Sequence, residues 1–331
     1  MIKVTALTSG KDFPSSRFRI RQFIAPLRAQ GIAVSEHYPL VNKYHLKRLA
    51  PLGMLARLPG VIAARSSSIT WFERELLPGQ FTLERYAGKK RLVDIDDALW
   101  LNAPRFSERL AELCDGVVAG NEFIAEHYRR CGARVWTVPT SVDSSIWQPA
   151  VARARDEWTI GWTGTSSNLK YLYLIAEPLA GFLAQHPEAR LLIVCDKKPS
   201  LPKLPAGSWR FVQWSSANEV ALIQSLDVGL MPLPDMEWTR GKCALKLIMY
   251  MAVGIPSVIS PVGVGKEILD RHEVALAALS ANDWFAALTR LLKDGKFAAR
   301  LGANGRRLVE KEFSVATNTP RIAAVIREIA G

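Results

Sequence analysis

The stretch from Asp227 to Asp270 constrains the fold of this 331-residue chain more than any other part of the sequence. It begins with a short apolar run, Val228–Met231, which a proline-rich loop ends, as expected of a buried strand. An apolar helical pattern follows over Cys243–Val253, and a second apolar run follows at Pro256–Ser260. The order of strand, loop, helix and strand is typical of a parallel sheet covered by helices.

The same alternation runs through the rest of the chain. Strands are predicted at Met1–Thr8, Ile32–Tyr38, Gly60–Ala64, Ser68–Phe72, Arg91–Asp94, Gly116–Ala119, Val135–Val138, Thr159–Thr163, Leu191–Cys195 and Trp209–Val212. Helices are predicted from the end of a loop at Ser9–Ser16 to about Gln30, and at Phe106–Leu113, Phe123–Arg130, Leu169–Gln185, Asn218–Ser225, Asn282–Asp294, Lys296–Glu310 and Ala316–Ile329. The pattern therefore favours an α/β protein.

A polar segment between Trp147 and Trp158 is the best candidate for a linker. Residues 1–150 and 151–331 are then predicted to form two doubly wound Rossmann-like domains, with a ligand in the crevice between them. The last helix is a candidate to pack back on the first domain.

Composition excludes several classes of protein. No apolar run reaches the roughly 20 residues of a membrane-spanning helix, and the N-terminus is predicted to be a strand and not a signal peptide. Neither the four cysteines nor the five histidines show metal-ligand spacing, and we expect the cysteines to be reduced thiols in a cytosol. No phosphate-binding P-loop and no nucleophile elbow occurs.

The formal net charge of +12 points to an anionic partner. Residues 1–60 contain ten lysines or arginines but only two acidic residues. The segment Tyr44–Arg65 mixes basic and apolar residues as an interfacial helix would, but Pro51 and Pro59 argue against a continuous helix. Peripheral contact with an anionic membrane and a plain basic surface remain alternatives. No nucleic-acid-binding module is present, so no nucleic-acid partner is expected.

Two groups of residues are candidates to bind an anion. Arg240, Lys242 and Lys246 form either a solvated basic corner or a diphosphate site, and the two lysines would share a face if both were helical. The turn Gly164–Asn168 follows a strand and opens a helix, so its N–H groups could face a phosphate, with Lys170 adding a charge. A simple helix cap is the alternative interpretation of this turn.

The acidic segment Asp94–Asp97 ends a predicted strand. Its carboxylates could hold Mg²⁺ or Mn²⁺, bind a substrate hydroxyl or cap a loop. If the strand continued, Asp94 and Asp96 would lie on one side and Asp97 elsewhere.

Two segments, WTIGWTGTSSNLKYL and DVGLMPLPDMEWTRGKCALKLIMYMAVGIPSVISPVGVGKEIL, resemble the donor half of a GT-B glycosyltransferase of family four, the "group 1" glycosyltransferases. FPSSRFRIRQFIAPLRAQGI, LVDIDDALW and CDGVVAGNEFIAEHYRRCGARVWTVPTSVD resemble the acceptor half. The resemblance implies a retaining, metal-independent hexosyltransferase without a cofactor. It would move a sugar from a nucleotide diphosphate donor to a glycan or lipid-linked acceptor in cell-surface polysaccharide synthesis. The enzyme would be cytoplasmic or peripheral on the inner face of the cytoplasmic membrane.

The resemblance also assigns residues to the donor. Gly164, Thr165 and Lys170 match the family's Gly-Arg…Lys motif, with threonine in place of arginine, so Arg240, Lys242 or Lys246 would supply the missing charge. Met249 stands where the family has a ribose-binding glutamate, and the other glutamate of that motif falls at Gly241 or Glu237. The remaining expected donor contacts are Ser166, Val264, Gly265 and Glu267.

Lys170, Lys246 and Arg240 are the residues expected to act in catalysis. Acceptor contacts are expected from Ser16, Arg17, Asp94 and Asp97. Because the arginine and glutamate of the family motifs are missing, a catalytically inactive GT-B protein that binds a nucleotide sugar or a glycan is the alternative function.

Overall fold

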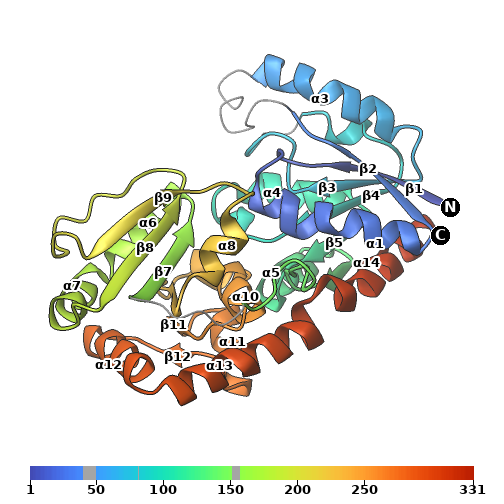
Figure 1. Cartoon of the computed structure of the whole chain (residues 1–331). Coiled ribbons are helices and arrows are strands. Elements are labelled where there is room, and N and C mark those ends of the chain that lie inside the picture. The colour runs from blue at the N-terminus through green and yellow to red at the C-terminus, as the bar shows by residue number, and fades with distance from the viewer. Residues whose placement is uncertain (40–49, 81, 151–156) are drawn as a thin grey trace. The chain divides into compact units, whose positions relative to one another are not determined.

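A computed structural model describes residues 1–39, 50–80, 82–150 and 157–331. Within these residues the chain forms two compact units, each organised around a six-stranded parallel sheet (Figure 1). Unit 1 comprises Met1–Ser141, Gly241–Cys243 and Phe313–Gly331, and unit 2 comprises Val142–Arg240 and Ala244–Glu312. The predicted pair of doubly wound α/β folds is confirmed.

Unit 1 has the strand order β2-β1-β3-β4-β5-β6. Its strands are β1 (Ile2–Leu7), β2 (Ile32–His37), β3 (Ile69–Glu73), β4 (Arg91–Ile95), β5 (Gly116–Ala119) and β6 (Val135–Thr137). Its helices are α1 (Ile24–Ala29), α3 (Ala50–Ala64), α4 (Pro104–Leu113), α5 (Glu122–Arg130) and α14 (Val315–Ala330), with helical turns η1 (Ser16–Ile20), η2 (Arg21–Phe23), η4 (Glu84–Tyr86) and η5 (Leu99–Leu101).

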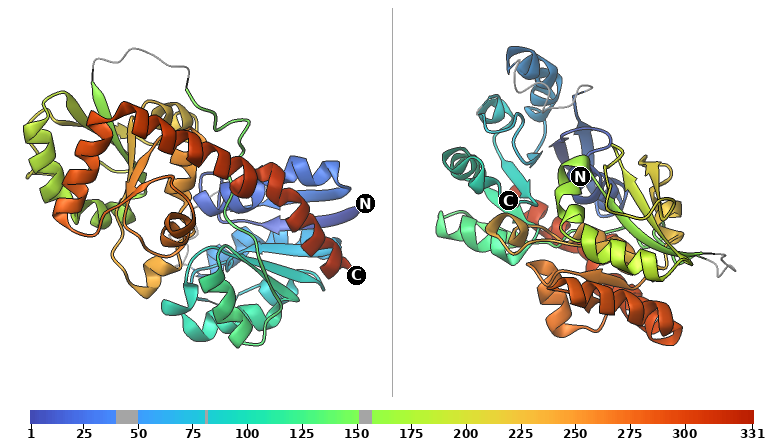
Figure 2. Two further views of the ribbon diagram at one scale, coloured as in Figure 1. Left: turned by 90° about the horizontal axis from the view of Figure 1, so that it is seen from below. Right: turned by 90° about the vertical axis from the view of Figure 1, so that its left-hand side faces the viewer.

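Helices cover both faces of the unit 1 sheet, which is why its strands are apolar on both sides. Neighbouring residues of β3 point to opposite cores, as strand geometry requires. Trp71 packs with α1 and α14, whereas Phe72 packs with α3, α4 and α5. Both chain ends lie in this unit, because α14 brings the end of the chain back to it (Figure 2).

Unit 2 has the strand order β12-β11-β10-β7-β8-β9. Its strands are β7 (Trp158–Gly164), β8 (Ala189–Cys195), β9 (Trp209–Gln213), β10 (Val228–Met231), β11 (Ser257–Ile259) and β12 (Leu276–Ala277). Its helices are α6 (Leu169–Tyr173), α7 (Ala176–Gln185), α8 (Glu219–Gln224), α9 (Glu237–Arg240), α10 (Leu245–Ala252), α11 (Val264–Arg271), α12 (Ala281–Lys293) and α13 (Gly295–Leu308), with turns η6 (Ser166–Asn168) and η7 (Val309–Phe313).

The strand order of unit 2 reverses direction between β7 and β10. Sheets of this order bind ligands beyond the carboxyl ends of the two strands at the reversal, because the flanking loops diverge there. In unit 1 the corresponding position lies between β1 and β3. These two strand ends therefore mark where each unit is expected to carry its function.

One predicted helix is broken in the structure. The segment Leu169–Gln185 forms two helices, α6 and α7, which Leu174 and Ile175 separate. Pro178 lacks an N–H group and its ring would clash with the carbonyl group of Leu174 in a continuous helix, which accounts for the break.

The prediction of a strand at Gly60–Ala64, and of no continuous helix around it, was wrong. These residues form the last turns of α3, which contains Pro59. Pro51 lies in the first turn, where its missing N–H group is not needed. Gly60 lets the helix approach the sheet closely, since a Cβ atom there would lie 2.7 Å from Leu7 Cδ2. Residues 44–49 of the predicted basic and apolar segment lie outside the described residues.

Among the residues that the structure describes, none of the helices combines the length and the hydropathy needed to cross a membrane.

Candidate functional site

Gly164 and Lys246 lie side by side at the reversal of the unit 2 sheet. Gly164 is the last residue of β7, and a Cβ atom there would lie 3.1 Å from Lys246 Cε and 2.9 Å from the Trp162 ring. The glycine thus leaves room for the stem of the lysine to cross the strand end. The Nζ atom of Lys246 lies 5.5 Å from the centroid of the Trp162 ring, a favourable position for a cation.

The turn after β7 is held by an acidic side chain. The N–H group and the Oγ atom of Ser166 donate hydrogen bonds to the two carboxylate oxygens of Asp196, which directly follows β8. Burial would raise the pKa of Asp196, but the hydrogen bonds from Ser166 outweigh it and hold the pKa below its usual value. A carboxylate therefore already accepts the N–H group that was predicted to face a phosphate.

Thr165 in this turn and Lys170 shortly after it are exposed. The hydroxyl group of Thr165 accepts a hydrogen bond from Asn168 Nδ2 at 2.8 Å. Lys170 lies in α6, and its Nζ atom is 5.1 Å from the centroid of the Tyr171 ring. Thr165 and Lys170 are thus both accessible to a ligand beyond the carboxyl end of β7.

The loop after β10 carries Arg240, whose charge is already paired. Its Nε and Nη2 atoms donate to Asp235 at 2.6 and 3.0 Å, and both side chains are exposed. The loop after β11 contacts the same segment, because a Cβ atom on Gly263 would lie 2.7 Å from the carbonyl oxygen of Arg240. Gly263 also has a φ of +52°, which favours glycine. Glu237 is exposed at the first position of α9.

Helix α11 begins at this loop. Val264 and Gly265 are buried in its first turn, and a Cβ atom on Gly265 would lie 3.1 Å from Met231 Cε at the end of β10. Glu267 forms an ion pair of 3.7 Å with Arg271, one helical turn on. The structure thus brings the predicted donor residues of two loops to one edge of the sheet.

The condition under which Lys242 and Lys246 would share a helical face is not met, because Lys242 lies outside helix α10. Helix α10 begins at Leu245. Ala244 before it has a φ of +51°, a left-handed conformation that does not continue the right-handed helix. Lys242 belongs to unit 1 with its neighbours Gly241 and Cys243. Its Nζ atom lies 3.7 Å from Asp97 Oδ1. The two lysines are therefore in different units.

Hydrogen bonds fix the segment Gly241–Cys243 in unit 1. Asn121 caps α5 by accepting from the N–H group of Ile124, and its Nδ2 atom donates to the carbonyl oxygen of Gly241 at 3.0 Å. The thiol of Cys243 donates to the carbonyl oxygen of Asp96 at 3.3 Å.

Met249, at the expected ribose position, is only 3% exposed within α10. Its thioether is at best a weak acceptor, and its burial removes it from a ligand. The assignment of Met249 to the donor site is therefore corrected: the side chain packs inside unit 2.

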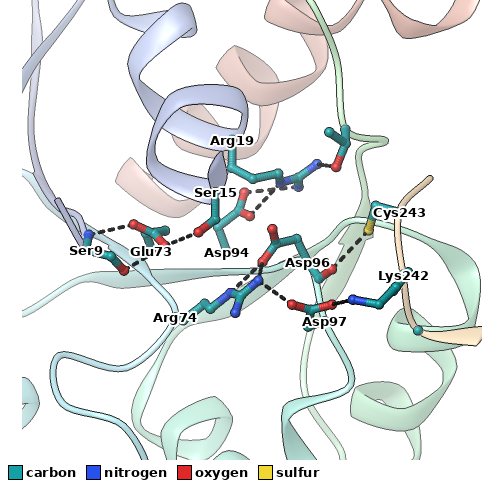
Figure 3. A network of polar contacts seen from close by, with 12 residues as sticks. Ser9, Ser15, Arg19, Glu73, Arg74, Asp94, Asp96, Asp97, Lys242 and Cys243 are labelled. Atoms are coloured by element: carbon teal, nitrogen blue, oxygen red, sulfur yellow. Dashed lines mark hydrogen bonds and ion pairs between the residues drawn. The ribbon is translucent and has the colours of Figure 1, made fainter. Parts of the chain in front are cut away.

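Glu73 occupies the reversal of the unit 1 sheet, at the end of β3 (Figure 3). Its buried carboxylate accepts four hydrogen bonds, from the N–H and hydroxyl groups of Ser9 and from the hydroxyl groups of Ser15 and Ser16. Ser16, an expected acceptor contact, is fully buried here. The sequence prediction missed Glu73, although an acid directly after a predicted strand was a usable signal.

Asp94 is buried in an ion pair with Arg19 (Figure 3). Arg19 Nε donates to Oδ1 at 2.7 Å, Nη2 donates to Oδ2 at 3.1 Å, and Nη1 donates to the carbonyl oxygen of Val138. Burial raises the pKa of Asp94 to about 6 even beside this arginine. Because Asp94 is 1% exposed and both its oxygens are bound, we correct its assignment from acceptor contact to structural ion pair.

Arg74 bridges Asp96 and Asp97 (Figure 3). Strand β4 ends at Ile95, so the alternation expected for Asp94–Asp97 does not hold, and Asp96 and Asp97 contact the same guanidinium group. Arg74 takes a φ of +56° to do so. The arginine thus stands where a metal ion would neutralise these two carboxylates. Arg17 lies 4.9 Å from the centroid of the Phe18 ring.

Known proteins resemble the chain in fold and, over its second half, in sequence. Residues 157–294 match the model of the family "Glycosyl transferases group 1". No sequence among the curated proteins matches the chain.

Three solved structures resemble the whole chain. Sucrose-phosphate synthase from Thermosynechococcus elongatus has 16% identity and a TM-score of 0.77 over 99% of both chains. Anabaena HepE in complex with UDP and glucose has 14% identity and a TM-score of 0.73 over 99% of this chain and 100% of that chain. A glycosyltransferase from Rickettsia africae has 12% identity and a TM-score of 0.72 over 99% of this chain and 98% of that chain.

These likenesses define the class of the protein as the GT-B fold. Over residues 157–294 the chain is similar to the group 1 glycosyltransferases, as its sequence motifs indicated.

Proposed function

We propose that the chain transfers a sugar from a nucleoside diphosphate donor, bound at the carboxyl edge of the unit 2 sheet. The observation that carries the proposal is the pairing of Gly164 with Lys246 at the reversal between β7 and β10. A glycine at a strand end admits a phosphate close to the backbone, and the lysine supplies its countercharge. The structure of HepE with UDP and glucose supports a donor of this kind.

The cations of this edge suit the chemistry of transfer. The anomeric carbon exchanges its bond to the diphosphate for a bond to an acceptor hydroxyl group, which loses its proton. Negative charge builds up on the leaving diphosphate, so fixed cations lower the barrier. We propose that Lys246, Lys170 and Arg240 supply these charges and that transfer needs no divalent metal and retains the anomeric configuration.

We propose a glycan or lipid-linked acceptor in cell-surface polysaccharide synthesis, bound by unit 1. Arg17 and Asp97 are the residues of the original acceptor assignment whose side chains are partly exposed. A lipid-linked acceptor would bring the enzyme to the inner face of the cytoplasmic membrane, which fits the excess of cations in residues 1–60.

Thermal unfolding in the presence of UDP, GDP, ADP and TDP, and then of their sugars, tests the donor proposal. Binding stabilises the folded state, so the preferred nucleotide should raise the melting temperature. The Lys246→Ala variant should lose most of this shift. If none of the nucleotides shifts the unfolding of the wild-type protein, the donor site is wrong.

The reaction itself is tested with the preferred donor. The anomeric configuration of the product, followed by NMR spectroscopy from the first turnovers, should equal that of the donor. Activity should persist in excess EDTA. An inverted product, or activity that EDTA abolishes and Mg²⁺ restores, would contradict the respective part of the proposal.

A second candidate function is sugar-nucleotide or glycan binding without catalysis. It is favoured by the polar groups at the donor edge that already have partners, Ser166 hydrogen-bonded to Asp196 and Arg240 paired with Asp235, and by the burial of Met249. Release of nucleoside diphosphate separates the two functions. Tight nucleotide-sugar binding with no release in the presence of acceptor extracts would favour the binding protein.

A further inference from the structure

Helix α3 exposes an apolar surface. Leu55 and Ile62 are 61% and 63% exposed, and they lie two helical turns apart on one side. Every described residue of the helix that is exposed is apolar: Pro51, Leu52, Leu55, Ala56, Leu58, Pro59 and Ile62. We call these seven residues the α3 surface. Figure 1 shows α3 at the outer side of its unit.

The charged residue of α3 points the other way. Arg57 is 4% exposed and donates hydrogen bonds to the carbonyl oxygens of Thr8 and Leu76. Burial lowers the pKa of Arg57 to about 10. A helix on the surface of a protein in water normally shows its polar residues to solvent and its apolar residues to the core. In α3 the inner side is apolar, since Val61 and Ala64 pack in the core, and the exposed side is apolar as well, which suits it to be covered.

The dimensions of α3 limit what can cover it. The helix has 15 residues. At 1.5 Å per residue it is about 22 Å long, shorter than the roughly 30 Å of a bilayer core. It cannot span a membrane, but an apolar face of this length suits the boundary between headgroups and acyl chains.

The positive charge near α3 favours a membrane over a second copy of the chain as the partner that covers the α3 surface. Between Glu36 and Glu73 the sequence contains five lysines or arginines and no acidic residue. Of these, Arg65 is exposed just after α3. A symmetric contact between two copies of α3 would bring like charges such as the two Arg65 side chains together, whereas anionic headgroups would pair with them.

We propose that the α3 surface binds an anionic lipid bilayer, with α3 lying in the plane of the interface. This gives the membrane contact of the proposed function a defined surface. The lipid-binding proposal rests on the proposed transferase function only for the biological purpose of the contact. Binding to lipid needs no nucleotide sugar and is measured without one.

Sedimentation with phosphatidylglycerol–phosphatidylcholine vesicles tests the proposal. The wild-type chain should bind these vesicles at least tenfold more tightly than vesicles of phosphatidylcholine alone. The double variant Leu55→Glu/Ile62→Glu should lose at least tenfold in affinity. A matched control, Leu174→Glu/Leu279→Glu, changes two exposed residues of unit 2 and should bind like the wild type.

Three results would overturn the proposal: no binding of the wild type to the anionic vesicles, equal binding to neutral vesicles, or equal binding of the α3 variant. A wild-type dimer in sedimentation equilibrium that the α3 variant breaks would assign the surface to a second copy instead. Because the four side chains are exposed, both variants should keep the wild-type melting temperature and its shift with nucleotide. A failure here therefore leaves the transferase proposal standing.

An independent observation concerns Glu108, His127 and Cys131. Glu108 lies on α4, and His127 and Cys131 are four residues apart on α5 and its C-terminal cap. One ligand atom from each lies within 4.8 Å of the others, and His127 Nε2 is 3.9 Å from Cys131 Sγ. The expectation that no histidine and cysteine share metal-ligand spacing overlooked this pair, because the spacing acquires meaning only on a helix.

The surroundings hold the histidine in place and are rich in negative charge. The ring of Trp100 stacks on the ring of His127, with centroids 3.9 Å apart and an interplanar angle of 8°. The carboxylates of Glu108 and Glu112 lie near the thiol of Cys131, so they would attract a cation bound beside it.

We infer that Glu108, His127 and Cys131 bind a Zn²⁺ ion, with water as the fourth ligand. Sulfur, imidazole and carboxylate are the donors that zinc takes in proteins. Ligand atoms of a tetrahedral zinc site lie roughly 3.5 Å apart, so the side chains need only small rotations to close around the ion. The ion would join α4 to α5 and has no part in sugar transfer.

Titration with Co²⁺, which substitutes for zinc and is coloured, tests this site on the whole chain. A thiolate bound to Co²⁺ gives a charge-transfer absorption band in the near ultraviolet. The band should appear with one equivalent of Co²⁺, disappear in Cys131→Ser and remain in the control Cys114→Ser. His127→Ala should weaken Zn²⁺ binding at least tenfold. Absence of the band in the wild type, its persistence in Cys131→Ser or its loss in Cys114→Ser would overturn the site.

Discussion

At the sheet reversal of unit 1, strand β3 ends in Glu73, whose carboxylate is saturated by four donors. At the sheet reversal of unit 2, strand β7 ends in Gly164, beside the stem of Lys246. The first arrangement buries a carboxylate, and hydrogen bonds from neighbouring residues of the same unit satisfy it. The second leaves space at the backbone and places a cation beside it.

This difference between two similar folds suggests a division of labour. Buried and paired charges add little net stability, but the loss of one partner is costly, so the unit 1 network holds its loops in one arrangement. Substitution of an exposed or partly exposed cation changes the free energy of unfolding little. The cations of unit 2 are of this kind, and they are therefore available to a ligand. Substitutions should therefore change stability in unit 1 and binding in unit 2.

The largest effect is expected for Arg19→Ala. It leaves Asp94 buried without its partner, which should destabilise the protein by about 3–5 kcal/mol. The midpoint of urea unfolding measures this. The double variant Arg19→Met/Asp94→Leu removes both charges and should recover most of the loss. If Arg19→Ala unfolds like the wild type, the unit 1 network is not a structural element.

Lys246→Ala should act on the reaction and not on stability. We expect at least a tenfold loss in transfer rate, about 1.4 kcal/mol in the barrier, because the leaving diphosphate loses a countercharge. The midpoint of urea unfolding should stay close to that of the wild type. Lys170→Ala should lose as much, and near-normal rates in both variants would remove the donor assignment.

Gly164→Ala should weaken nucleotide binding by several-fold. Its Cβ atom would stand 3.1 Å from Lys246 Cε and 2.9 Å from the Trp162 ring, so the lysine must move. Isothermal titration with the preferred nucleotide measures the change. Gly181→Ala in α7 is the matched control, since no atom lies within 4 Å of its Cβ position. Equal affinity in both variants would show that the strand end is not where the nucleotide binds.

The smallest effect is expected for Asp235→Asn. It releases Arg240 from its carboxylate partner and should tighten nucleotide binding two- to threefold, on the order of 0.5 kcal/mol. The control Asp270→Asn breaks the exposed pair with Lys266 and should leave the affinity unchanged. Weaker binding in Asp235→Asn would mean that the ion pair with Arg240 positions the loop and does not compete with the ligand.

The sequence by itself determined most of the order of strands and helices and, through the motifs near Gly164 and Lys246, the resemblance to the group 1 glycosyltransferases. Both follow from local patterns: an apolar run such as Val228–Met231 needs burial, and a glycine such as Gly31 ends a helix by its positive φ. The structure places most of the predicted elements within a few residues of their expected bounds.

Only the tertiary structure decided which charges are buried and paired. Asp94 pairs with Arg19 from another element, and Arg74 gathers Asp96 and Asp97, so strand alternation could not assign these carboxylates. Helix α3 forms despite Pro59, since its inner side packs on the sheet. Its exposed apolar side was invisible in the sequence because local pattern shows which residues share a face, whereas the neighbours of that face decide whether water reaches it.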